Sequence, residues 1–138
     1  EAASQAAKLN VARPKLLGVT VLTSLDRSDL ESTGVDADPS DQVLRLAALA
    51  HESGLDGVIC SPLEIEALRK QCGPDFVLMV PGIRPVGSAA NDQKRAMTPR
   101  QAVDLGATNL VVGRPIYQAQ DPRAAAEAIA RESGVNDL

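Results

Sequence analysis

The stretch Val80-Pro81-Gly82-Ile83-Arg84-Pro85 decides how the rest of the chain is interpreted. It follows the apolar run 76–79, and it combines Pro and Gly, which bend the backbone, with an arginine. A similar change follows the apolar run 109–112, at Gly113-Arg114-Pro115. Glycine lets the backbone approach a ligand closely, and the forked guanidinium of arginine suits a phosphate dianion. We therefore expect the phosphate-binding end of a β/α protein, to which the polar run Asp92-Gln93-Lys94-Arg95 also belongs.

Outward from this stretch, strands and helices alternate along the chain. The expected strands are residues 15–23, 55–60, 76–80 and 108–112. The expected helices are residues 1–10, 28–33, 41–53, 62–71, 98–106 and 121–132. Expected N-caps are Ser40, Ser61, Thr98 and Asp121, the last three each followed by proline. The strand at 15–23 is apolar almost throughout, which predicts cover on both faces. Short buried strands alternating with helices favour a parallel sheet with right-handed crossovers.

Two α/β architectures fit this order of elements: an open doubly wound sheet, or part of a (β/α)₈ barrel. The dinucleotide fingerprint G-x-G-x-x-G and the P-loop are both absent from the sequence. The Gly, Pro and Arg residues described above all follow the C-terminal ends of expected strands. Barrel sites are built at that end, with phosphate held by the loops after the last two strands.

Composition limits the classes of protein that fit. A chain of 138 residues with 44% hydrophobic and 23% charged residues is ordinary for one soluble globular domain. Its net charge of −4, without a basic tract, argues against nucleic-acid binding, and one Phe, one Tyr and no Trp leave few stacking surfaces. The sequence shows no membrane-length apolar run and no signal-peptide pattern. Two cysteines are too few for a disulfide framework, so we expect a cytoplasmic protein with Cys60 as a buried hydrophobe.

Four segments carry a resemblance to a known family. They are LLGVTVLTSLD at 16–26, GLDGVICSP at 54–62, VPGIRPVGSAANDQKRAMTP at 80–99 and NLVVGRPIYQAQDP at 109–122. At this spacing they resemble the second half of the bacterial-type orotidine 5′-phosphate decarboxylases. The resemblance implies a homodimeric (β/α)₈ TIM barrel, of which residues 1–138 supply about four β/α units, the C-terminal half of a single barrel domain. It also implies a cofactor-independent carboxy-lyase that converts orotidine monophosphate to uridine monophosphate and CO₂ in de novo pyrimidine biosynthesis.

The resemblance also implies roles for particular residues. Thr23 would contact the pyrimidine, and Pro81 would lie against the base. The phosphate would be held by Arg84, Gln93, Gly113 and Arg114, and the loop that carries Gln93 would close over the substrate. Taken singly, each arginine could be a surface residue, Thr23 a helix cap and Gly113 only a turn, so the family pattern carries these assignments. No metal is expected, because Asp36, Asp38 and Asp41 lack the Gly and Glu of a calcium loop.

The sequence departs from the family pattern because it lacks the catalytic lysine and the Asp-x-Lys-x-x-Asp set. No segment matches them, and Lys8 and Lys15 stand in other contexts. We therefore expect no catalytic residue in this chain, an absent N-terminal barrel half that carries them, and no activity from these residues alone. Three alternatives stay open: a related phosphosugar decarboxylase barrel, which the run 92–95 disfavours, a non-enzymatic phosphate-binding half-barrel, and a purely structural module.

Overall fold

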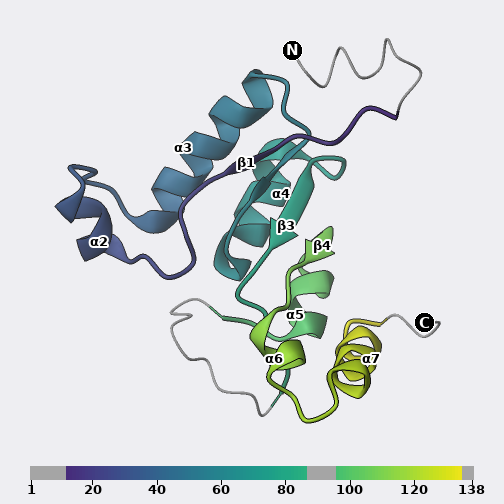
Figure 1. The fold of residues 1–138 in the computed structure, drawn as a ribbon. Coiled ribbons are helices and arrows are strands. Elements are labelled where there is room, and N and C mark those ends of the chain that lie inside the picture. The colour runs from purple at the N-terminus through teal and green to yellow at the C-terminus, as the bar shows by residue number, and fades with distance from the viewer. Residues whose placement is uncertain (1–11, 87–95, 135–138) are drawn as a thin grey trace.

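The computed structural model describes residues 12–86 and 96–134, and it contains one four-stranded parallel sheet (Figure 1). Its strands are β1 (Leu17–Val19), β2 (Gly57–Ile59), β3 (Val77–Val80) and β4 (Asn109–Leu110). The helices are α2 (Arg27–Ser32), α3 (Pro39–Glu52), the 3₁₀ turn η1 (Pro62–Glu64), α4 (Ile65–Cys72), α5 (Pro99–Asp104), α6 (Arg114–Tyr117) and α7 (Pro122–Glu132). No helix within the described residues is long and apolar enough to cross a membrane. The helix expected at residues 1–10 lies outside them.

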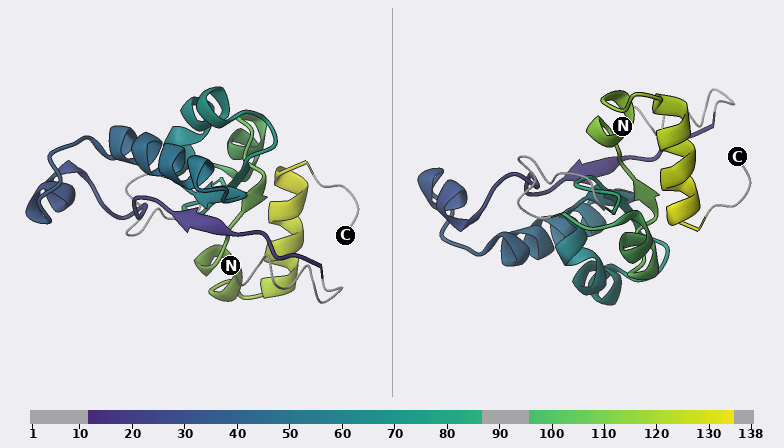
Figure 2. Two further views of the ribbon diagram at one scale, coloured as in Figure 1. Left: turned by 90° about the horizontal axis from the view of Figure 1, so that it is seen from above. Right: turned by 90° about the horizontal axis from the view of Figure 1, so that it is seen from below.

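The strand order settles the choice between the two architectures. The strands pair in the order β1-β2-β3-β4, every pair is parallel, and neighbours in the sheet are neighbours in sequence. A doubly wound sheet reverses its order at a switch point and carries helices on both faces. Here α3 and α4 lie together on one face of the sheet (Figure 2). An unreversed order with helices on one side is the arrangement of a (β/α)₈ barrel, of which this sheet forms a part.

The core lies between the sheet and these helices. Val58 of β2 and Leu78 and Val80 of β3 are fully buried. The helices contribute Val43, Ala47, Ile65 and Leu68, which are buried to the same degree. The opposite face of the sheet is more open, and Val19 of β1 is 61% exposed. The prediction that the first strand is covered on both faces is therefore wrong for the structure of the described residues.

Most helix ends follow the predicted caps. Thr98 and Ser61 each form a capping box with the residue three positions later, and the Asp121 carboxylate accepts a hydrogen bond from Ala124 N–H. The prediction for Ser40 was wrong. Helix α3 begins at Pro39, because proline already has the helical φ and lacks an N–H that would need a partner at that position. Ser40 instead lies in the first turn.

Every strand is shorter than the strand range expected from the sequence. Only three residues of the expected strand 15–23 pair with β2, at Leu17 to Val19. Beyond them Thr20 N–H still donates to Ile59 O at 3.3 Å, and then the chain turns, with Leu25 N–H donating to Leu22 O at 3.0 Å. Apolar character marks burial, whereas a strand needs a neighbour in register, so the two need not have equal length.

Candidate functional site

A cavity of about 250 Å³ opens at the C-terminal edge of the sheet. Its lining consists of Val19, Val21, Leu22, Thr23, Ser24, Ile59, Cys60 and Pro81. The structure therefore brings together Thr23 and Pro81, which are 58 positions apart in sequence. Thr23 is only 9% exposed, and its neighbours in the wall are mainly apolar. Whole ligand sites typically measure about 300–1,000 Å³, so this cavity has room for a ring-sized part of a ligand.

Two residues end β3, and the first of them, Pro81, lines the cavity. Pro81 has no N–H to donate to a ladder, which limits strand continuation at this point. Gly82 follows with φ of +81°, a left-handed conformation that residues with a Cβ adopt at a cost. The next residue, Ile83, is fully buried and anchors the turn. This local chemistry explains why the chain leaves the sheet directly behind Pro81.

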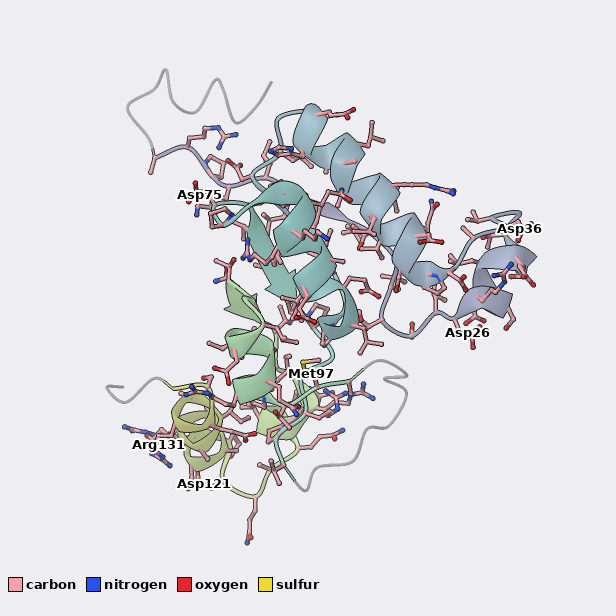
Figure 3. All side chains as sticks on the ribbon, turned by 180° about the vertical axis from the view of Figure 1, so that it is seen from behind. Asp26, Asp36, Asp75, Met97, Asp121 and Arg131 are labelled. Carbon is pink, nitrogen blue, oxygen red and sulfur yellow. The ribbon has the colours of Figure 1, made fainter. Side chains whose placement is uncertain are left out.

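Arg84 lies at the base of the segment that carries Gln93. Its N–H donates to Met97 O at 2.9 Å, and Met97 N–H donates to Gly82 O at 3.4 Å, so the two ends of that segment are joined by an isolated parallel bridge. Figure 3 labels Met97 where the chain returns toward α5. The Arg84 side chain is turned inward: it is 9% exposed, and Nη1 donates to Ile83 O at 2.7 Å. It does not line the cavity. Gln93 itself lies outside the described residues.

Gly113 and Arg114 form the turn after β4. Because Leu110 pairs with Val80, this turn and Pro81 follow neighbouring strands at the same edge of the sheet. The Gly113 carbonyl accepts hydrogen bonds from the first turn of α6, while a Cβ at Gly113 would meet only Tyr117 Cε1, at 3.6 Å. Its φ of −111° does not demand glycine either. Nothing in the described packing around a Cβ at this position requires glycine.

Sequence reasoning missed Glu64, which is 1% exposed. Its carboxylate accepts hydrogen bonds from Ser61 N–H at 3.0 Å and from Ser40 Oγ at 3.3 Å. It thus joins the start of α3 to the segment just after Cys60 of the cavity wall. The pattern Ser61-x-x-Glu64, typical of a capping box, was the available signal. The prediction that Cys60 is a buried hydrophobe is confirmed, since it is 1% exposed.

An ion pair lies at the other end of the strands, where β1 and β2 begin. Arg13 Nη1 donates to both carboxylate oxygens of Asp56, at 2.8 and 2.9 Å, and Leu16 N–H donates to the same carboxylate at 2.6 Å. The hydrogen bond from Arg13, followed by that from Leu16, holds the pKa of Asp56 below its ordinary value. This pair fixes the entry of β1 beside the entry of β2. It lies at the strand starts, away from the cavity.

The sequence of residues 1–129 matches the family model described as the orotidine 5′-phosphate decarboxylase / HUMPS family. The chain belongs to this family. It is 58% identical over 120 residues to the orotidine 5′-phosphate decarboxylase of Pseudomonas savastanoi pv. phaseolicola, covering 87% of this chain and 51% of that protein. It is 56% identical over 126 residues to the orotidine 5′-phosphate decarboxylase of Pseudomonas putida strain KT2440, covering 91% and 54%. The chain spans about half the length of the curated relatives it matches.

A solved structure agrees with the sequence comparison. The crystal structure of orotidine 5′-phosphate decarboxylase from Lactobacillus acidophilus superimposes with a TM-score of 0.75 at 44% identity, covering 92% of this chain and 51% of that one. The family fold and the unreversed parallel sheet therefore agree.

Proposed function

We propose that this chain is the base- and phosphate-binding part of an orotidine 5′-phosphate decarboxylase, a cofactor-independent carboxy-lyase of pyrimidine biosynthesis. Residues 1–138 would be the C-terminal half of its single barrel domain. The observation that carries the proposal is the meeting of Thr23 and Pro81 in one apolar cavity, beside the strand that leads to Gly113 and Arg114, in a chain of this family. Such a site has one wall for a ring and one cationic turn for a phosphate.

In the proposed reaction, the residues of this chain bind the substrate. Pro81 lies against the pyrimidine face and Thr23 offers a hydroxyl to a polar edge of the ring. Arg114, the N–H groups at Gly113 and the amide of Gln93 bind the phosphate, because charge-assisted hydrogen bonds suit its oxygens. Arg84 joins the base of the Gln93 segment, so it contributes to phosphate binding by holding that segment or by direct contact.

The bond that breaks joins the carboxylate to the pyrimidine ring. CO₂ leaves, the electron pair stays on the ring carbon as a carbanion, and a proton from an ammonium group completes uridine monophosphate. The family places that lysine, with its aspartates, in the N-terminal half of the barrel. Phosphate contacts remote from the reacting carbon can still lower the barrier, because they stabilise the closed, desolvated enzyme in which the carbanion forms.

The complete protein would be a cytoplasmic homodimer that binds orotidine monophosphate and uridine monophosphate. Light scattering of the purified complete protein tests the dimer. A related phosphosugar decarboxylase barrel is the alternative. The names of the relatives with more than 50% identity favour the pyrimidine nucleotide.

The test uses a complete barrel, made by joining this chain to the N-terminal half of the Pseudomonas putida relative. Calorimetry should show that the barrel binds uridine monophosphate well and uridine far more weakly. Arg114→Ala should weaken binding of the nucleotide by roughly 2–4 kcal/mol, as expected when one partner of a charged hydrogen-bonded pair is removed. Arg123→Ala is the matched control, because Arg123 is 90% exposed and pairs with Glu127 on α7.

A second substitution uses the geometry of the turn. Gly113→Ala should leave the free energy of unfolding nearly unchanged, because a Cβ there meets only one atom at an ordinary contact distance. It should nevertheless weaken nucleotide binding, since the methyl group would occupy space that the phosphate needs. Equal affinity of Arg114→Ala and the parent barrel for uridine monophosphate would disprove the assignment, as would equal affinity for the nucleoside and the nucleotide.

A further inference from the structure

The guanidinium of Arg69, on α4, lies beneath the starts of β3 and β4. Its Nε donates to Gly106 O at 2.8 Å and its Nη2 donates to Thr108 Oγ1 at 2.6 Å. Its Nη1 lies within hydrogen-bonding distance of the carbonyl oxygens of Gly73, Pro74 and Phe76. A guanidinium has N–H groups on all three nitrogens, and all three are used here. One side chain thus joins α4, the entry of β3, the end of α5 and the entry of β4.

Thr108 passes this contact on to β3. Its Oγ1 accepts from Leu78 N–H at 3.1 Å as well as from Arg69, and its own N–H donates to Leu78 O at 3.0 Å. Within the described residues, the strand that follows, β4, consists of Asn109 and Leu110 and pairs with β3 alone. A strand this short has few ladder bonds to fix its register. The bonds between Arg69, Thr108 and Leu78 are therefore a large part of what holds β4 in place.

The position of β4 determines the position of the turn that follows it. Near the turn, Val111 N–H of the segment after β4 donates to Val80 O of β3 at 2.9 Å, two residues before Gly113. A slip of one residue along β3 would move the turn by about 3.3 Å relative to Pro81. Misplacement of a binding group by about 1 Å can already cost about a hundredfold in rate.

We propose that Arg69 is a positioning residue for phosphate binding: by fixing the entry of β4, it sets the place of Gly113 and Arg114 at the other end of that strand. The proposal rests on the proposed function of this turn. Arg69 would not contact the ligand itself, because its acceptors Gly106 and Thr108 precede β4, whereas the turn follows the other end of that strand. A residue that only stabilised the fold would affect ring and phosphate binding alike. A residue that positions β4 affects phosphate binding selectively.

The experiment compares uridine monophosphate with uridine in the complete barrel described above, at a temperature where circular dichroism shows each variant folded. Arg69→Met removes every N–H of the guanidinium and keeps an apolar stem. It should weaken binding of the nucleotide by about tenfold or more and change binding of the nucleoside by less than about twofold. Arg69→Lys keeps a cation with fewer well-directed donors and should fall between. The control is Lys70→Ala, at the next, exposed position of α4.

A second variant keeps the test decisive where Arg69→Met does not fold. Thr108→Val removes only the hydroxyl that accepts from both Arg69 and Leu78, and it should reproduce the selective loss of nucleotide affinity, whereas Thr108→Ser should restore it. Nucleotide affinity equal to that of the parent in Arg69→Met, or in Thr108→Val where the former is unfolded, overturns the proposal. So does an equal loss for nucleotide and nucleoside.

A parent barrel that binds no uridine monophosphate would count against the proposed function, and hydrogen exchange then tests the positioning alone. The amide of Val111, which donates across β4 to β3, should exchange about tenfold faster in Thr108→Val, as expected when local opening becomes easier. The amide of Asp56, which donates to Leu16 O near β1, should be unchanged. Equal exchange of Val111 in the parent and the variant would show that Arg69 and Thr108 do not hold β4.

Discussion

Gly57→Ala should be among the most damaging single-methyl changes in this protein. Gly57 lies in β2 opposite Val77 of β3. A Cβ built on it would come to 2.1 Å from Val77 O, 2.6 Å from Val77 Cβ and 2.7 Å from Val77 C, whereas ordinary contacts begin at 3.4 Å. The nearest obstacle is backbone, which cannot rotate away as a side chain can. The two strands must therefore separate by more than 1 Å, from a normal spacing of about 4.8 Å.

The cost follows from the bonds that this separation stretches. Asp56 O accepts from Val77 N–H at 2.9 Å and Met79 O accepts from Cys60 N–H at 3.2 Å, one on each side of the obstacle. Losing two backbone hydrogen bonds costs about 1–3 kcal/mol. Overpacking adds about 1–3 kcal/mol. The expected loss of about 2–6 kcal/mol is a large share of the roughly 5–15 kcal/mol by which domains are stable.

The matched control is Gly18→Ala in the neighbouring strand β1. A Cβ there would meet only side chains, Leu55 Cδ2 at 3.2 Å and Ala50 Cβ at 3.5 Å, so a small rotation of Leu55 makes room. Its loss should stay within about 1 kcal/mol, offset in part by the lower entropy of the unfolded chain. Urea unfolding followed by far-UV circular dichroism suits the chain, which has no Trp and one Tyr. Equal urea midpoints for the two variants would refute the reasoning.

Three further predictions concern other parts of the chain. Because Arg13 holds the pKa of Asp56 below 3.8, this carboxylate contributes stability above pH 3.8 that is lost as the pH falls through the lowered pKa. Asp56→Asn should therefore reduce the loss of unfolding free energy at acid pH, and an equal loss in the parent and the variant would contradict this. Burial raises the pKa of the Cys72 thiol above 9.0, and Cys60 is almost fully buried, so both should react slowly with dithiobisnitrobenzoate until urea unfolds the chain, and fast reaction in the native protein would disagree. Residues 1–138 alone should not turn over orotidine monophosphate, as measured by its loss of absorbance, whereas the chain joined to a relative's N-terminal half should. Turnover by a preparation shown by mass to hold only these residues would disprove the expectation that the catalytic lysine lies outside them.

The sequence by itself determined the alternation of strands and helices and most of their ends. Ser61-Pro62, Thr98-Pro99 and Asp121-Pro122 act on backbone groups within three residues, so their effect can be predicted from neighbours in the chain alone. The family motifs likewise pointed to the cavity edge, where the structure places Thr23 and Pro81 together. Their proposed contacts with substrate stay predictions.

The tertiary structure decided what depends on partners distant in sequence. The order β1-β2-β3-β4 chose a barrel over a doubly wound sheet, and no local signal specifies which strands pair. No signal in the sequence indicated that Arg84 is 9% exposed and that its side chain donates to Ile83 O, and its contact with phosphate stays a prediction. Arg69 carried no motif at all, because its acceptors include Gly106 and Thr108, 37 and 39 positions away. Caps and turns are settled by bonds between near neighbours, whereas strand order and long side-chain contacts exist only once packing has brought distant segments together.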